Sequence, residues 1–319
     1  MSGAETIGVD LGGTKLLVGV LDGERQVLWE SRERSTGQSE RELVEMIGRE
    51  VAEAQAARPG TSAVGLGIPA TIHRARGVAI AAVNLDFDEV PIRDMVSERV
   101  GVPVFVDNDA NLAMLAEHHY GAARGARNAV MLTIGTGIGG GLVIEGELYR
   151  GTVGAGAELG HIVVEIDGPP CQGNCPGRGH AETLASGTAL GAEGRAAAQR
   201  DPQSALGRLL AEGVEIDGKA VTAAATGGDA TAIEVVALVG RRIGVALTSL
   251  ANIFEPEVIV IGGGVIAAGE LLLEPAREEL RARALTPMNG TRVVAAQLGP
   301  DAGMIGAATM ARIELEKAA

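Results

Sequence analysis

Two stretches of the sequence have the same order of elements: an apolar strand, a loop of glycine and threonine, and a second apolar strand. In residues 7–21 the loop is Gly12-Gly13-Thr14-Lys15, and in residues 129–144 it spans residues 135–141. The flanking strands are rich in Val, Ile and Leu, which favour sheets. The two stretches share few residues but a clear pattern, and a repeated pattern indicates repeated structural units. We therefore expect two related lobes with a cleft between them.

The rest of the sequence alternates between β-branched runs and longer amphipathic stretches, which is typical of an α/β protein. In residues 39–57, Leu43, Ile47 and Val51 recur at steps of four and predict a helix. The other elements that we expect are strands at 64–68, 102–106 and 257–261 and helices at 111–120, 233–254 and 303–315. The 319 residues suffice for two domains, and because only 2% are aromatic, the cores must be aliphatic.

The charge of the chain argues against two classes of partner. Its net charge is −14, whereas nucleic acids and anionic membranes are bound by patches of Lys and Arg. The uncharged run at 129–144 is too short and too rich in glycine to span a membrane. We therefore expect no nucleic-acid partner and no membrane contact, and an anionic substrate would be held locally by a metal ion and backbone N–H groups.

Cysteine content and the N-terminus indicate the compartment. The two cysteines are too few for a disulfide framework, and their close spacing suits thiolate ligands in a reducing compartment. The first residues lack a basic segment followed by an apolar one, so we expect no secretory signal. The expected location is the cytoplasm.

The loop that begins at Asp10 is a candidate phosphate site. A Walker loop or a dinucleotide-binding fingerprint opens into a helix, but here Leu16 to Val20 continue as a strand, so the loop is the tip of a β-hairpin. Such a tip can direct N–H groups and the Thr14 hydroxyl at a phosphate, while Asp10 holds Mg²⁺ directly or through water. An ordinary hairpin turn is the alternative. The second loop favours the phosphate site, because two tips facing one cleft can clamp the same nucleotide.

Four polar residues lie in the five positions from Asp107 to Asn111, where a strand ends and a helix begins. Helix capping is one explanation, but a cap needs only one such residue. Ligands of open α/β sheets gather beyond the carboxyl ends of the strands. A carboxylate at this position can accept the proton of a hydroxyl group as it attacks phosphorus.

The segment from Glu158 to Glu182 interleaves possible metal ligands with acids. It contains Glu158-Leu159-Gly160-His161, Cys171, Cys175, His180 and Glu182. The cysteines could instead be small buried apolar residues and the histidines surface residues. However, residues 168–179 are rich in Gly, Pro and Asn and can bury little, so a closed set of metal ligands would explain how this loop keeps one shape.

These motifs together resemble the ROK family of sugar kinases, and within it the bacterial glucokinases. They follow the family's order over nearly the whole chain. The matching motifs are Asp10-Leu11-Gly12-Gly13-Thr14-Lys15, Gly65-Leu66-Gly67-Ile68-Pro69, Asn84-Leu85, Asn108-Asp109-Ala110-Asn111, the loop at 135–141, Glu158-Leu159-Gly160-His161, the cysteine loop and Gly262-Gly263-Gly264.

The resemblance implies an α/β, two-lobed, actin-like (ribonuclease-H-like) ATPase fold with an interlobe cleft. The small lobe would span residues 1–118, with a C-terminal helix at about 303–319 packing back on it, and the large lobe residues 119–302. It also implies ATP-dependent phosphorylation of a hexose, with glucose converted to glucose 6-phosphate, and a structural zinc beside the sugar.

The resemblance also implies roles for individual residues. Asp109 would be the base that deprotonates the 6-hydroxyl group of the hexose. The sugar would be bound by Asn84, Asn108, Glu158, His161 and Glu182. ATP with Mg²⁺ would be bound by Asp10, Gly12, Gly13, Thr14, Lys15, Thr136, Gly137, Gly263 and Gly264.

The zinc loop departs from the family's C-x-C-G-x-x-G-C-x-E pattern. Counting back from Glu182, His180 replaces the third cysteine and Cys175 matches the second, but Gly173 occupies the first position and Cys171 lies two residues earlier. We predict a tetrahedral site of His161, Cys171, Cys175 and His180, because two cysteines and two histidines are a good zinc set. Ala70 and Phe87 also depart from the family, which usually has glycine and tryptophan there, and affect the shape of the sugar pocket.

Two other functions fit the same resemblance. The first is a sugar-responsive repressor, although the chain begins directly at its first strand and leaves no room for an N-terminal helix-turn-helix. The second is a kinase for N-acetylmannosamine, N-acetylglucosamine or fructose, or one that uses polyphosphate, because selectivity depends on pocket shape. The family also implies a homo-oligomer, a dimer or a tetramer.

Overall fold

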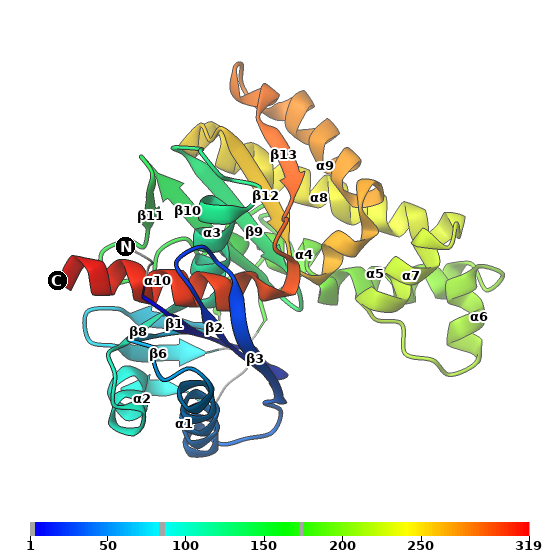
Figure 1. The fold of residues 1–319 in the computed structure, drawn as a ribbon. Coiled ribbons are helices and arrows are strands. Elements are labelled where there is room, and N and C mark those ends of the chain that lie inside the picture. Colours follow the sequence, from blue (N-terminus) through cyan, green and yellow to red (C-terminus); the bar gives the residue numbers. More distant parts are fainter. Residues whose placement is uncertain (1–3, 83–86, 173–174, 319) are drawn as a thin grey trace.

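The computed structural model describes residues 4–82, 87–172 and 175–318, and it contains two five-stranded sheets (Figure 1). The first has the order β3-β2-β1-β4-β8, in which β1, β2 and β3 are antiparallel and β4 and β8 continue parallel to β1. Its strands are β1 (Thr6–Leu11), β2 (Lys15–Leu21), β3 (Val27–Arg34), β4 (Val64–Ile68) and β8 (Val104–Asn108).

The second sheet repeats this topology with the order β11-β10-β9-β12-β13. As in the first sheet, the three strands that come first in sequence (β9, β10 and β11) are antiparallel, and β12 and β13 run parallel to β9. The strands are β9 (Ala129–Ile134), β10 (Ile138–Ile144), β11 (Glu147–Tyr149), β12 (Val258–Gly262) and β13 (Arg292–Ala295). The α/β class predicted from the alternation of β-branched and amphipathic stretches is therefore confirmed, and the two sheets correspond to the repeated pattern.

A small third sheet and the helices complete the described part of the chain. The third sheet consists of β5 (Ala70–His73), β6 (Val78–Ala82) and β7 (Asp88–Val90). The helices are α1 (Glu40–Ala57), α2 (Ile92–Val100), α3 (Asp109–Tyr120), α4 (Ala181–Ala185), α5 (Gly187–Arg200), α6 (Ala205–Ala211), α7 (Gly218–Thr226), α8 (Ala230–Phe254), α9 (Glu270–Arg283) and α10 (Ala302–Ala318). Short 3-10 turns lie at Leu159–His161, Gly264–Ala268, Met288–Gly290 and Gly299–Asp301.

Helix α1 shows how the sequence specifies a local element. Ser39 caps it by accepting a hydrogen bond from the backbone of Glu42, whose side chain accepts one from the backbone of Ser39 in return. Leu43, Ile47 and Val51 are fully buried against the first sheet, as their spacing predicts. The cap and the apolar face thus define the start and the orientation of the same helix.

Each large sheet has its own aliphatic core, and α3 and α10 join the two. One core lies on the first sheet with α1 and α2, and another lies between the second sheet and α8. A third combines Met114 of α3 and Met304 of α10 with Leu17 of the first sheet and Val260 of the second. Figure 1 accordingly shows α10 (red) running between the two sheets.

Glycines let α10 approach the first sheet closely. A Cβ atom on Gly8 of β1 would overlap the carbonyl oxygen of Met304, and one on Gly65 of β4 would overlap that of Ala307. Helix backbone therefore lies directly on strand backbone at these two points, where any side chain would push the helix away.

Several boundaries differ from those that we expected, and those around Asp109 and the second glycine loop differ in ways that affect the motifs. Asp107 and Asn108 belong to β8, and α3 begins at Asp109. The loop expected at 135–141 is shorter, because β10 begins at Ile138 and includes three glycines. These glycines lie in the strand because neighbouring side chains, such as Met114 over Gly141 and Leu159 over Gly140, occupy the space of a Cβ atom.

Within the described ranges, no helix is both long and apolar enough to cross a membrane.

Candidate active site

Asp109 lies at the junction of β8 and α3, where the preceding residues are already engaged. Asn108 is the N-cap of α3: its Oδ1 accepts hydrogen bonds from the backbone of Ala110 (2.9 Å) and Asn111 (3.2 Å). Its Nδ2 donates to the Ala70 carbonyl at 3.3 Å. Asn108 is therefore the one residue of the polar cluster that caps the helix. Asp109 follows it on the first turn of α3.

The carboxyl group of Asp109 has an unusual pKa. Burial is the main reason that its pKa is raised to about 6, and the negative charge of Glu158 raises it further. A hydrogen bond from the backbone of Ala110 acts in the opposite direction. A carboxylate with a pKa near neutrality is well suited to accept a proton at physiological pH.

The first glycine loop joins β1 to β2 beside a second carboxyl group with a raised pKa. Gly13, Thr14 and Lys15 are exposed at the hairpin tip, which the hydrogen bond from Gly12 N to Lys15 O (2.8 Å) closes. Burial is the main reason that the pKa of Asp10 is raised to about 7, and the nearby charge of Asp109 adds to this effect. The structure therefore brings the phosphate-loop candidate and the candidate base close together.

The second loop is residues 135–137, between β9 and β10. Thr136 is exposed, and the backbone N–H of Gly135 donates to the Gly137 carbonyl at 2.9 Å. Glu182 contacts the end of this loop, since its Oε2 accepts a hydrogen bond of 2.8 Å from Ile138 N. The loop expected to bind nucleotide and a residue expected to bind sugar are therefore in direct contact.

Gly263 and Gly264 follow β12 and are exposed. Gly263 has a φ of 84°, and a Cβ atom there would overlap the backbone of Ile134. Only glycine fits this close approach without strain. The structure thus places the third glycine segment beside the start of the second loop.

Three of the expected sugar-binding residues, Glu158, His161 and Glu182, come from two short elements in the middle of the chain. Glu158 is exposed and precedes the 3-10 turn Leu159–His161, and Glu182 lies in α4. Gly160 holds the turn against β10, since a Cβ atom there would overlap the Ile138 carbonyl. Asn108, a fourth expected sugar contact, lies at the end of β8, whereas Asn84, the fifth, and Gly173 of the cysteine loop lie outside the described residues.

His161, Cys171, Cys175 and His180 gather into one cluster. One ligand atom from each lies within 4.8 Å of all the others. The Nδ1 atoms of the histidines are 3.2 Å apart, Cys171 Sγ is 3.6 Å from His161 Nδ1, and Cys175 Sγ is 3.7 Å from His180 Nδ1. These four residues can hold a metal ion.

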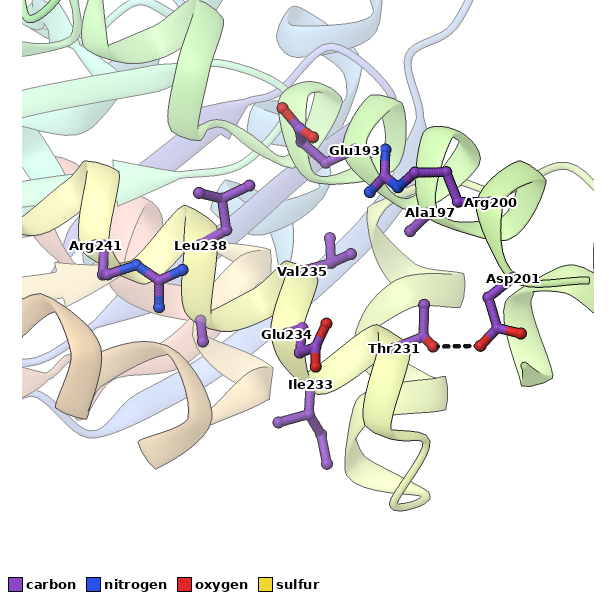
Figure 2. Close-up of a pocket in the computed structure, with 11 residues that line it drawn as sticks. Glu193, Ala197, Arg200, Asp201, Thr231, Ile233, Glu234, Val235, Leu238 and Arg241 are labelled. Atoms are coloured by element: carbon purple, nitrogen blue, oxygen red, sulfur yellow. Dashed lines mark hydrogen bonds between the residues drawn. The ribbon is translucent and has the colours of Figure 1, made fainter. Parts of the chain in front are cut away.

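A recess of about 650 Å³ lies elsewhere, between α5 and α8 (Figure 2). Its lining includes Arg200 and Asp201 from the α5 end and Thr231 from α8, and Thr231 donates a hydrogen bond of 2.7 Å to Asp201. None of the residues that we predicted to bind ATP, sugar or metal lines this recess. We therefore do not assign the kinase chemistry to it.

Two contacts of the site were not foreseen from the sequence. Arg150 forms an ion pair with Asp107, and Glu117 accepts hydrogen bonds from two separate chain segments. Asp107 stood out as part of a polar cluster, but Arg150 follows a short strand with no distinguishing pattern. Arg150 is 43 residues from Asp107, and Gln297 is 180 residues from Glu117, so no local signal could identify these contacts.

The duplicated sheet topology and the similarity to solved sugar kinases define a two-lobed, actin-like sugar-kinase fold. The chain belongs to the ROK family, whose model matches residues 6–314.

Three relatives illustrate the similarity. The chain is 38% identical to the glucokinase of Streptomyces coelicolor over an alignment of 317 positions, which covers 96% of this chain and 97% of the relative. It is similar to a ROK family glucokinase from Streptomyces griseus solved in complex with glucose and AMPPNP, with a TM-score of 0.87, 38% identity, and coverage of 97% of this chain and 99% of that one. A ROK hexokinase from Thermus thermophilus matches with a TM-score of 0.78 and 35% identity, over 98% of this chain and 99% of that one.

Proposed function

We propose that this chain is a glucokinase, which transfers the γ-phosphoryl group of ATP to glucose and yields glucose 6-phosphate. The observation that carries the proposal is the buried carboxyl group of Asp109 on the first turn of α3, whose pKa is raised to about 6. Glu158 is near enough for its charge to raise this pKa, and the charge of Asp109 in turn raises the pKa of Asp10 in the phosphate loop. Similarity to glucokinases over almost the whole chain supports the same substrate and donor.

In this mechanism Asp109 accepts the proton of the 6-hydroxyl group of glucose as that oxygen attacks the γ-phosphorus. Asn84, Asn108, Glu158, His161 and Glu182 hold the other hydroxyl groups. The proposed lobes are residues 1–118, on which α10 packs, and residues 119–302. When the two lobes close over the sugar, they exclude water from the phosphoryl transfer. Such positioning, rather than covalent chemistry, is the main contribution of proteins to phosphoryl transfer.

ATP would be held by the three glycine segments, through Gly12, Gly13, Thr14 and Lys15, through Thr136 and Gly137, and through Gly263 and Gly264. Asp10 offers carboxylate oxygens, the ligands that Mg²⁺ prefers. Its pKa of about 7 means that it can lose its proton readily when a cation binds. The ion supplies positive charge that stabilises the transferring phosphoryl group.

The metal cluster fits a structural zinc. For a tetrahedral zinc with ordinary bond lengths, two nitrogens lie about 3.3 Å apart and a nitrogen and a sulfur about 3.6 Å apart. The observed separations of 3.2, 3.6 and 3.7 Å agree with these values. Because Nδ1 of His161 faces the cluster, Nε2 on the other side of the ring remains available for the sugar.

The proposal extends to assembly and location. We expect a homo-oligomer, a dimer or a tetramer, in the cytoplasm, where reduced thiols can serve as metal ligands. Light scattering of the purified protein measures the assembly, and a single species with the mass of one chain would contradict it.

A coupled assay with a panel of sugars and two donors tests the proposed function. Glucose, fructose, N-acetylglucosamine and N-acetylmannosamine are each supplied with ATP or polyphosphate. The highest kcat/KM is expected for glucose with ATP. Turnover of another sugar at a higher kcat/KM would reassign the substrate, and no turnover of any sugar would contradict the kinase function.

A further inference from the structure

Asp107 supports the backbone that presents Asp109. Its carboxylate lies at the end of β8, and only 1% of the side chain is exposed. Its Oδ1 accepts hydrogen bonds from Asn108 N at 2.9 Å and from Asn111 Nδ2 at 3.1 Å. Both donors belong to the turn that leads from β8 into α3, so the Asp107 carboxylate fixes the shape of this turn.

The other oxygen of Asp107, Oδ2, pairs with Arg150, which follows a strand of the second sheet. Arg150, which follows β11, donates from Nε to Asp107 Oδ2 at 2.5 Å and from Nη1 to the Leu148 carbonyl at 3.3 Å. Its side chain is 17% exposed. A buried carboxylate is costly without a partner, and Arg150 supplies one. The ion pair therefore joins the strand that ends at the base to a segment from the other sheet.

Residues 150–156 form a loop that is closed by a backbone hydrogen bond and that leads to Glu158. Gly156 N donates to the Arg150 carbonyl at 2.8 Å, and a Cβ atom on Gly156 would overlap the Arg150 backbone. The same segment is attached to the first half of the chain, since Arg74 N donates to the Val153 carbonyl at 2.9 Å. Arg150 therefore lies in a segment that backbone hydrogen bonds hold in one shape and that continues to Glu158.

We propose that the Asp107–Arg150 ion pair is a positioning device that sets the separation between Asp109 and Glu158. This inference rests on the proposed function, in which these residues are the base and a sugar ligand. With the pair intact, the hydroxyl group held by the sugar-binding side chains meets the base at the distance needed for proton transfer. A misplacement of about 1 Å can reduce a rate about 10²-fold, so the pair acts on turnover without touching the substrate.

Arg150→Met, Arg150→Lys and a matched control test the inference. Arg277 of α9 is the control, because it also pairs with a carboxylate (Glu274, 3.3 Å), donates to a carbonyl (Val293, 3.0 Å) and is mostly buried, with 25% of its side chain exposed. Arg150→Met is expected to lower kcat about 10- to 100-fold while KM for ATP changes less than about 3-fold. Arg150→Lys, which restores the positive charge, is expected to recover part of the loss, and Arg277→Met to keep the parent kcat.

The double variant Asp107→Asn/Arg150→Met covers the case in which an unpaired Asp107 prevents folding. It removes both charges, and its kcat is expected to fall about as far as that of Arg150→Met, because both changes break the same contact. A folded single or double variant with kcat within about 2-fold of the parent would overturn the inference. An equal loss in Arg277→Met, or a loss that Arg150→Lys does not reduce, would also overturn it. An inactive parent, in contrast, contradicts the proposed function itself.

Discussion

The carboxylate of Glu182 accepts a hydrogen bond of 2.8 Å from the backbone N–H of Ile138, the residue at which the second glycine loop becomes β10. A Cβ atom on Gly137 would overlap the same carboxylate. Glu182 is proposed to bind the sugar, and Gly137 belongs to the loop proposed to bind ATP. One side chain thus connects the two binding regions.

We therefore predict that Glu182→Ala raises KM for both substrates. Loss of a hydrogen bond to a charged group costs about 1.5–3 kcal/mol, which corresponds to roughly a 10- to 100-fold change, and the freed loop would bind ATP less well. Glu158→Ala is the control and should raise KM for glucose alone. Steady-state kinetics with each substrate varied in turn measures both, and an unchanged KM for ATP in Glu182→Ala would contradict the connection.

The metal cluster predicts a difference between two substitutions of His180. His180→Cys keeps four ligands and should retain one zinc per chain, because three cysteines and one histidine also form a structural set. His180→Ala should lose the metal, together with thermal stability and glucose affinity, because His161 and the loop that leads to Glu182 lose their anchor. Metal analysis and calorimetry measure these effects. A parent protein without zinc, or a His180→Ala variant that retains it, would contradict the assignment.

The raised pKa of Asp109 predicts two effects of pH. Because the base must be ionised, kcat/KM should rise with pH through about 6. The folded protein also binds this proton more tightly than the unfolded chain, so the group favours folding below about pH 4 and loses that contribution as the pH rises through 6. Asp109→Asn should therefore be more stable than the parent by about 3 kcal/mol at pH 7.5 and not at pH 4. Urea unfolding at the two pH values tests this, and an equal difference at both would contradict it.

Glu117 joins the two segments through which the chain passes between the sheets. Its side chain is fully buried, with Oε2 accepting from Ala122 N at 2.7 Å and Oε1 from Gln297 N and Leu298 N at 2.8 Å each. Residue 122 follows α3 on the way to β9, and residues 297 and 298 lie between β13 and α10. The carboxylate thus holds both connections at one point.

Glu117→Gln should reduce the free energy of unfolding by about 1–3 kcal/mol, because an amide replaces one accepting oxygen with a donor and leaves a buried N–H group unpaired. Glu316→Gln, at an exposed position of α10, is the control and should change it by less than about 0.5 kcal/mol. Urea denaturation measures both values. Equal stability of the two variants would argue against the role of Glu117.

The sequence predicted those helices and strands whose apolar residues form a regular pattern and are buried in the fold. Strands β1, β4 and β9 are mostly apolar and almost entirely buried, so the ends that we predicted are close to those observed. Strand β3 was not predicted because it lies at a sheet edge, half of its residues are charged and most of them are exposed. Glycines 139–141 suggested a loop, although they belong to a strand whose neighbours leave no room for side chains. That last property depends on tertiary packing, which no local pattern reveals.

The candidate site shows the same division. Asp109 and the two hairpin loops were identifiable because each belongs to a compact motif of residues adjacent in sequence. Asp107 and Arg150 are 43 residues apart and Glu182 and Ile138 are 44 apart, and their contacts arise only when the sheets come together. Short sequence motifs therefore predict the candidate catalytic and binding residues, whereas the long-range contacts that position them cannot be predicted from the sequence.

The central claim is that Asp109 is the base of a glucose kinase, and Asp109→Asn tests it most directly when turnover and glucose binding are measured on the same preparation. We predict a decrease of about 10²- to 10⁴-fold in kcat with glucose and ATP, the range for a positioned general base. The Kd for glucose measured by calorimetry should stay within about 3-fold of the parent value, because the sugar-binding side chains remain. A variant that binds glucose and turns over at nearly the parent rate would contradict the assignment.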